Sequence, residues 1–418
     1  MFMHKSKKGF TIVELVIVIA VIAILAAVLI PTFSNLVKKA NMSADQQAVR
    51  QMNTLLAAEE ATGKPDTFAN AINALLASKV SMKNYKALVS DMSFYWVKAL
   101  NRVVYVDKNM TVTYPADLTE TTYNMADGWF SLSGEVATDA KWEEKIDAAT
   151  KTITIDNGAT MVAFMEAVRT GDNAAKAVTT LNLTADIDLK GAEANFGIFS
   201  GTMTINGKKE NGEAAKIYNF RNGVSSQYSD NNATNVLAAY GFGLFGEVKG
   251  TVTVKDVEFC GASVIAMPKT GKSYASGAGI IAGIVNGNAT LTLENVTISD
   301  SYVHAGKKAG AVIGYARCET TFEVKGDKGL TVNNVQVSGG IQLAALVGYF
   351  QSEIKNGDSY LGASTINITA PVTATNVVVT RDTSYGDFGV TGQERTFETS
   401  NHYWWVVKSN ASEAKNCH

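Results

Sequence analysis

Residues 8–33 read KGFTIVELVIVIAVIAILAAVLIPTF, and this stretch decides how the fold begins. Between Phe10 and Ile30 the only charged residue is Glu14. A helix over this run is about 30 Å long, which is the thickness of the hydrocarbon core of a bilayer. Lysines at positions 5, 7 and 8 precede the run, so we expect the N-terminus to stay cytoplasmic while the rest of the chain is exported.

A cleaved secretory signal peptide is the simplest alternative for an apolar run that follows lysines. The run has no Ala-x-Ala spacing of the kind that signal peptidase recognises, and it is long for the apolar part of a signal peptide. A carboxylate inside a membrane segment costs roughly 2.5–3.5 kcal/mol on insertion scales, so Glu14 is expected to have a function. These features favour a retained helix.

The residues from Lys8 to Glu14, KGFTIVE, resemble the N-terminal signal of type IV pilins and of the pseudopilins of type II secretion. The resemblance implies that a prepilin peptidase cuts between Gly9 and Phe10 and methylates the new amine of Phe10. It also implies that Glu14, the fifth mature residue (14 − 9 = 5), pairs with the N-terminal amine of a neighbouring subunit. Such a pair neutralises two charges in a low-dielectric helix bundle. Pro31 stands where many of these proteins have a proline that kinks the helix.

The first part of the chain divides into four segments. Residues 1–9 are the leader, and residues 10–62 are an assembly helix whose membrane span is 10–30; Gly63 and Pro65 end this helix. Residues 63–115 show two short helical patterns and then three strand patterns, so they resemble a pilin head, an α+β unit with a small antiparallel sheet. Residues 116–150 are polar and irregular, and we expect them to be a connecting segment.

Residues 151–400 carry two staggered repeats. An Asn-Val or Asp-Val pair begins at positions 256, 295, 334 and 376, and an apolar pair followed by glycine ends at positions 246, 283, 314 and 348. Two motifs that recur together four times predict an all-β parallel solenoid, in which each coil stacks on the next. The pattern resembles the right-handed parallel β-helices of bacterial surface proteins with GLUG-type repeats. Residues 401–418 are expected to be a C-terminal tail.

Within this solenoid, one residue of each coil is expected to occupy the same turn. The four residues, which would form a ladder of stacked side chains with the aspartate capping one end, are Asp256, Asn295, Asn334 and Asn376. A short amphipathic helix near residues 161–168 is expected to cap the N-terminal end. The alternative is a β-sandwich, whose strands also alternate but which does not explain the repeat of roughly 39 residues.

Composition argues against several classes of function. The 37 basic and 39 acidic residues give a net charge of −2, so we expect no nucleic-acid partner. Three cysteines without a CxxC pair and four scattered histidines offer no metal site, and we expect no cofactor. Acidic pairs in the β region are explained more simply by a solvated face than by catalysis, so an enzyme is not expected. Trp404 and Trp405 are candidates for stacking on a sugar ring.

Together these features predict a surface-exposed, type IV pilin-like subunit, either a minor or a tip subunit. It would be a single-pass protein of the cell membrane that moves to the cell surface or pilus, where the solenoid serves adhesion or ligand binding. Its partners would be the prepilin peptidase, other pilin subunits, the assembly machinery and the membrane, with a glycan or a surface protein as ligand. One alternative is a pseudopilin of a secretion or competence system, and another is a membrane-tethered enzyme that degrades polysaccharides.

The leader makes a prediction that mass spectrometry can test. The N-terminal peptide of the native protein should begin with N-methylated Phe10, because the residues around Gly9 match the prepilin signal. A mature chain that begins beyond Ile30 would instead indicate cleavage by signal peptidase.

Overall fold

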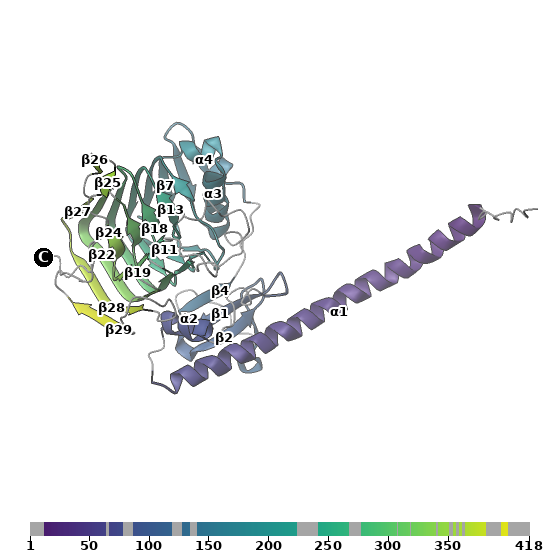
Figure 1. The fold of residues 1–418 in the computed structure, drawn as a ribbon. Helices are drawn as coiled ribbons and strands as arrows, with labels where there is room; N and C mark the ends of the chain where they lie inside the picture. The colour runs from purple at the N-terminus through teal and green to yellow at the C-terminus, as the bar shows by residue number, and fades with distance from the viewer. Residues whose placement is uncertain are drawn as a thin grey trace, which may run out of the picture.

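The computed structural model describes residues 12–63, 67–77, 87–118, 128–133, 140–223, 241–266, 277–306, 308–317, 319–339, 342–350, 354–356, 359–361, 364–381 and 394–399. A long helix projects from a small head, and the head lies against a larger β body (Figure 1). Gly9, Phe10, Cys318, Trp404 and Trp405 lie outside the described residues.

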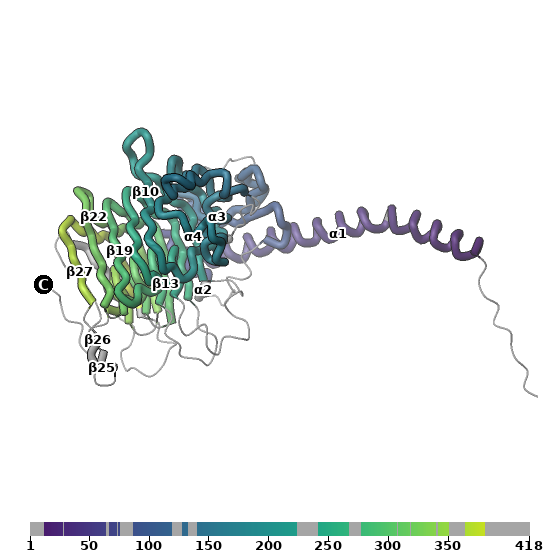
Figure 2. The backbone as a smooth tube through the Cα atoms, turned by 90° about the horizontal axis from the view of Figure 1, so that it is seen from above, coloured from purple at the N-terminus to yellow at the C-terminus, as the bar shows by residue number. Residues whose placement is uncertain are grey.

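The long helix is α1, which spans Ile12–Glu60. It continues without a break through Pro31, where a kink is typical of the family that the sequence resembles, and Figure 2 shows one continuous coil. It is the one helix of the described chain that is long and apolar enough to cross a membrane. Only its last third packs against protein, where Val49, Met52 and Leu56 are buried.

The head consists of helix α2 (Phe68–Ala77) and a four-stranded antiparallel sheet. The sheet has the order β3-β2-β1-β4, with β1 Ser93–Val97, β2 Arg102–Val106, β3 Val112–Tyr114 and β4 Trp129–Ser133. Strand β4 comes from the stretch expected to be a connecting segment, and it pairs with β1. The 3₁₀ turns Lys98–Leu100 and Ala116–Leu118 flank these strands.

The head's core is aromatic. Phe130 of β4 lies 5.1 Å from the ring of Phe68 and 5.8 Å from that of Trp96, measured between centroids. The second short helix, expected around residues 85–89, is absent from the described part of that stretch, because residues 88–91 form a turn whose amides bind a carboxylate of α1.

The β body begins with elements at one end. These are the 3₁₀ turn Glu143–Lys145, β5 Ile146–Asp147, β6 Thr152–Ile155, helices α3 Gly158–Thr170 and α4 Asn173–Ala177, β7 Thr180–Leu183 and β8 Ile187–Asp188. Helix α3 covers this end of the sheets (Figure 1), as expected for the 161–168 segment, and Met161, Phe164 and Met165 reach the core there.

Three further groups of strands build the rest of the body. The large sheet adds β10 Thr202–Asn206, β11 Ala215–Tyr218, β12 Arg221–Asn222, β14 Thr251–Lys255, β15 Val257–Cys260, β16 Ser263–Ala266, β19 Thr290–Ala305, β22 Thr321–Gly339, β27 Thr365–Ile368, β28 Val372–Arg381 and β29 Glu394–Thr399. The five-stranded sheet has β9 Ile198–Phe199, β13 Phe245–Val248, β18 Ala282–Val285, β21 Ile313–Ala316 and β24 Val347–Phe350. Two small sheets have β17 Gly277–Ala278, β20 Lys308–Gly310 and β23 Gln342–Ala344, and β25 Ile354–Asn356 with β26 Ser359–Leu361.

The pairing in this body is largely parallel. In the large sheet β10, β14, β19, β22 and β27 follow one another in parallel register, which aligns Thr202, Thr251, Thr290, Thr321 and Thr365. The antiparallel pairs of that sheet are β5 with β6 and β28 with β29, at its two ends. A β-sandwich is built from antiparallel strands, so these pairings do not support that alternative.

The glycine that ends the second repeat has a packing reason. Strands β17, β20 and β23 lie against the five-stranded sheet so closely that backbone meets backbone. A Cβ added at Gly283 would lie 2.1 Å from the amide nitrogen of Phe242, and one at Gly314 would lie 2.2 Å from that of Ala278. A Cβ at Gly348 would likewise lie 2.5 Å from the carbonyl oxygen of Ala309, so no larger residue fits these three repeats, whereas at Gly246 the nearest atoms would lie 3.1 Å away.

The alternation of buried and exposed residues along β19 predicts opposite effects for neighbouring substitutions. Val296 is 1% exposed within the core of the body, whereas the next side chain, Thr297, is partly exposed on the outer face. Val296→Asp should lower the local free energy of unfolding by about 3–5 kcal/mol, because it buries an unpaired charge. Hydrogen exchange of the β14, β19 and β22 amides measures this loss. Thr297→Asp is the matched control, and equal loss of protection in both variants would contradict the assignment of faces.

Candidate functional site

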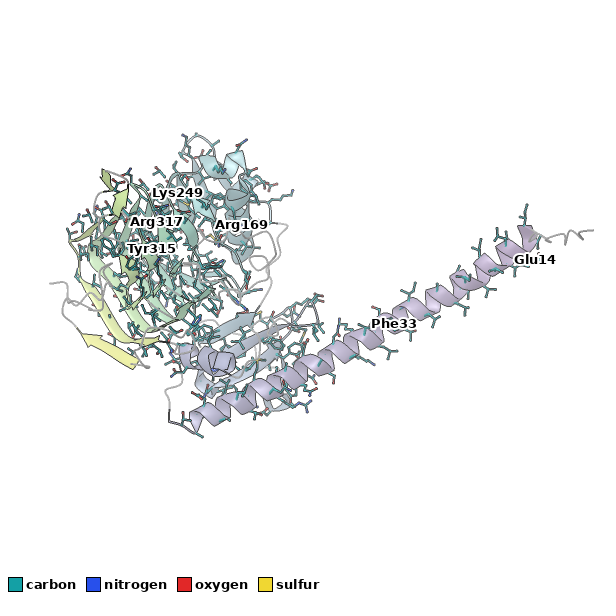
Figure 3. All side chains as sticks on the ribbon, in the orientation of Figure 1. Glu14, Phe33, Arg169, Lys249, Tyr315 and Arg317 are labelled. Carbon is teal, nitrogen blue, oxygen red and sulfur yellow. The ribbon has the colours of Figure 1, made fainter. Side chains whose placement is uncertain are left out.

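The first half of α1 is apolar and has no protein packed against it. Its most apolar stretch of 18 residues has a mean hydropathy of 3.3, and none of this stretch is buried. Ile12 is 81% exposed and Phe33 is 69% exposed, and Figure 3 shows this part of the helix projecting away from the head. Because exposing so much apolar surface to water is unfavourable, this half requires a lipid or protein environment.

Glu14 lies in the first turn of α1, at the far end from the head (Figure 3). A carboxylate in the first turn of a helix interacts favourably with the unpaired amides there. The cleavage and methylation positions, Gly9 and Phe10, precede the described residues. The structure therefore places Glu14 at the helix terminus nearest to them in sequence.

A buried carboxylate attaches α1 to the head. Asp45, which is 2% exposed, accepts hydrogen bonds from the backbone amide of Leu88 (2.9 Å), from that of Val89 (3.3 Å) and from the hydroxyl of Tyr105 (2.6 Å). Burial raises the pKa of Tyr105 well above its usual value, and the neighbouring carboxylate raises it further. The hydroxyl therefore stays protonated and donates to Asp45 at every physiological pH.

A second polar side chain attaches the helix to β2. The side-chain oxygen of Asn53 accepts from the amide of Val103 at 2.6 Å, and its nitrogen donates to the carbonyl of Val103 at 3.0 Å. Asn53 thus occupies the place of a neighbouring strand at this point of the sheet. Neither residue was predicted to be functional, although Asp45 stands on the same helical face as Val49 and Met52, and this position is a signal that it is buried.

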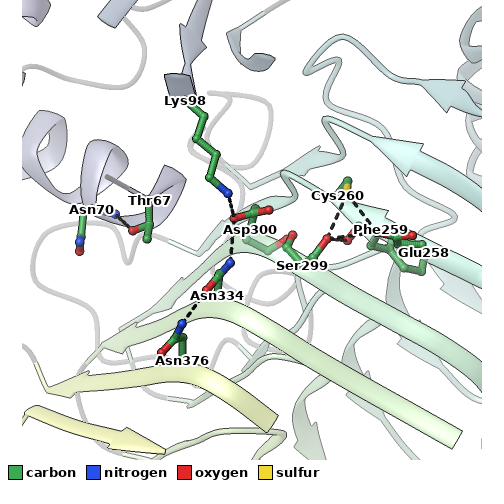
Figure 4. A network of polar contacts seen from close by, with 11 residues as sticks. Thr67, Asn70, Lys98, Glu258, Phe259, Cys260, Ser299, Asp300, Asn334 and Asn376 are labelled. Carbon is green, nitrogen blue, oxygen red and sulfur yellow. Dashed lines mark hydrogen bonds and ion pairs between the residues drawn. The ribbon is translucent and has the colours of Figure 1, made fainter. Parts of the chain in front are cut away.

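The four residues expected to form one ladder occupy two corners of the β body. All four have a positive φ, between 51° and 55°. The side-chain nitrogen of Asn295 donates to Asp256 at 2.9 Å, and that of Asn376 donates to Asn334 at 3.0 Å. Asn334 itself donates not to Asn295 but to Asp300, at 3.3 Å (Figure 4).

An insertion separates the two corners. Strand β22 aligns Lys325 with Glu294 but Leu330 with Val296, so four residues lie opposite the single residue Asn295, which is an insertion of three residues. The amide of Lys328, within this insertion, donates to the side chain of Asn295 at 2.9 Å. We call the corner at Asp256 and Asn295 the first corner, and the corner at Asp300, Asn334 and Asn376 the second corner.

One cysteine and one histidine of the β body have clear surroundings. Cys260 is a free thiol whose sulfur lies 3.0 Å from the hydroxyl of Ser299, and burial raises its pKa to about 12, so it is not a reactive thiolate. His304 is 7% exposed and contacts the hydroxyl of Ser338 at 2.9 Å. Trp404 and Trp405, the candidates for sugar stacking, lie outside the described residues.

The attachment of α1 makes a prediction about the stability of the head. Asp45→Ala should leave two buried donors, the amide of Val89 and the hydroxyl of Tyr105, without an acceptor, and each such donor costs about 1–3 kcal/mol. We expect faster hydrogen exchange of the β2 amides in the full chain, corresponding to a loss of about 2 kcal/mol or more. Tyr105→Phe should have a smaller effect, because it removes one hydrogen bond and leaves no buried donor. The control is Gln47→Ala, at an exposed position of the same helix; equal exchange in both alanine variants would contradict the role of Asp45.

Comparison with known proteins identifies the N-terminal segment. Residues 4–30 match the family described as the prokaryotic N-terminal methylation motif. The chain is 41% identical over 54 residues to type IV major fimbrial proteins FimA of Dichelobacter nodosus, which is 13% of this chain and 35% of that relative. The chain thus spans about a third of the length of the curated relatives it matches. No solved structure matches it. The chain therefore carries the N-terminal methylation motif of type IV pilins on a pilin-like hydrophobic helix.

Proposed function

We propose that this protein is a surface-displayed pilus subunit, minor or located at the tip, that is held in its filament by α1. The observation that carries the proposal is the exposed apolar half of α1, most of which lies within the matched methylation motif and which is far from the β body. A prepilin peptidase would cut before Phe10 and methylate it. Other subunits would then cover the apolar half, with Glu14 paired to the N-terminal amine of a neighbour.

In this proposal the β body has the fold of a right-handed parallel β-solenoid. Three sets of parallel strands support this assignment, because in each set consecutive partners are about one sequence repeat apart. Left-handed backbone at equivalent corners, such as Asp300 and Asn334, also suits a chain that turns at the same place in each coil. The right hand follows from the strong general preference for right-handed connections between parallel strands of one sheet.

The size of the β body supports a minor or tip location. More than half of the 418 residues follow the head. If every subunit along a shaft carried such a body, these bodies would crowd one another around the axis. A solenoid at a tip or at sparse positions would instead present its long face to a surface, where it could bind a glycan or a protein. The proposal assigns the solenoid a binding role without catalysis.

Labelling of filaments tests the proposal. An antibody against residues 180–400, with gold detection, should label native filaments at tips or at sparse positions. Glu14→Ala should still be cleaved but should lose most of the labelling, because an amine would remain unpaired in the apolar bundle. Dense labelling along the shaft would contradict the minor location, and labelling confined to the membrane would favour a pseudopilin. Activity of the purified chain on polysaccharides would overturn the non-catalytic role.

A further inference from the structure

Strand β4, at the edge of the head's sheet, connects the head to the β body by hydrogen bonds. The amide of Ser131 donates to the side-chain oxygen of Asn219 at 2.8 Å, and the hydroxyl of Ser131 donates to the carbonyl of Lys190 at 2.8 Å. Arg221 donates to the carbonyl of Leu132. Asn219 is 1% exposed and Arg221 is 5% exposed, so these bonds are buried inside the molecule.

The β body also supplies part of the head's apolar core. Along β16, Val264 faces the core of the body, whereas Ile265 points to the other side and joins the cluster that contains Phe68 and Trp96. Tyr302 of β19 joins the same cluster, and its hydroxyl lies 2.8 Å from that of Ser338. Both Ile265 and Tyr302 are at most 1% exposed. Without the body, the head's core would lack these two side chains.

One coil departs from the corner pattern where the head docks. Residues Asn219, Gly261, Asp300, Asn334 and Asn376 occupy the second corner in successive coils, all with positive φ. In four of these five coils the residue with this left-handed backbone is asparagine or aspartate, and in the remaining coil it is Gly261. A Cβ at Gly261 would lie 2.2 Å from Cδ1 of Phe130, a ring of the head's core. The glycine is therefore explained by contact with the head and not by backbone conformation alone.

An ion pair lies beside this contact. The ammonium of Lys98, at the end of β1, lies 2.9 Å from the carboxylate of Asp300, which also accepts from Asn334 (Figure 4). The side chain of Asp300 is 17% exposed and that of Lys98 is 39% exposed. Helix α2 lies against β19 and β22 on the same side of the body. The head therefore contacts four successive coils, those of β12, β16, β19 and β22.

We propose that the β body is the docking platform on which the head completes its fold. The platform is formed by Asn219, Arg221, Gly261, Ile265, Asp300 and Tyr302, all of which follow the head in the chain. The head reaches its native state only after these coils have formed. Where the chain is a pilus subunit, as proposed above, only molecules with a folded β body would then present a folded head behind the assembly helix.

Two substitutions in the full-length chain, solubilised in detergent, test the platform by hydrogen exchange. Gly261→Asn keeps a residue that tolerates the left-handed backbone but places a side chain against Phe130, and Ile265→Ala removes an apolar contact without adding bulk. We expect the β1 and β2 amides to exchange about tenfold faster or more in both variants, whereas β18 and β21 stay protected. Gly287→Asn is the matched control, because Gly287 also has positive φ (62°) but nothing lies within 4 Å of its Cβ position.

The outcomes separate this proposal from the proposed function. If both variants leave β1 and β2 as protected as in the parent chain, the head folds by itself and the platform is overturned. The platform is likewise overturned if Gly287→Asn exposes the head as much as Gly261→Asn does. If exchange in the head rises as expected but the parent chain is never found in filaments, the proposed function fails while the platform stands.

Discussion

The parallel hydrogen-bond ladder between successive repeats of the β body is the interaction on which the rest of the structure depends. It places equivalent residues of different repeats beside one another, so that a corner becomes a column running from Asn219 to Asn376. Because the column is regular, the β body forms a continuous surface beside it, and the head packs against this surface. The head in turn holds the last third of α1 through Asp45 and Asn53. The β body therefore positions the head, and the head sets the direction in which the apolar half of the helix projects.

The elements with a periodic signal could be predicted from the sequence. The long helix was expected to span 10–62 and is seen from Ile12 to Glu60, and the two staggered repeats correctly indicated strands that pair in parallel. The ladder could be predicted only in part, because an Asn-Val pair can begin at either corner. Asn295 belongs to the first corner and Asn334 to the second, and only the pairing register, shifted by the insertion before Leu330, distinguishes them.

The rest could not be predicted because it depends on contacts between segments far apart in the chain. Strand β4 has no regular pattern around it, and its place is fixed by Asn219 and Arg221, roughly ninety residues later. The apolar residues at 85, 88 and 89 have helical spacing, but the carboxylate of Asp45 binds the amides of Leu88 and Val89, and a turn follows. In both cases tertiary hydrogen bonds to buried groups outweigh a weak local preference, because an unsatisfied buried partner costs more than that preference supplies.

Glycine is required in this chain for two different reasons. One is close packing within the β body, and the other is contact between the β body and the head. At Gly283 and Gly314 glycine is required by the packing of the β body itself, where one backbone lies against another. At Gly261 a side chain would collide with Phe130 of the head. Glycine therefore stands where the other repeats have asparagine or aspartate at the same corner. A residue that follows the repeat is explained by packing between successive repeats, whereas a residue that departs from it is explained by a contact outside the repeats. In a repeat protein the exceptions to the pattern are therefore the positions at which a contact with another part of the molecule, or with a partner, should first be sought.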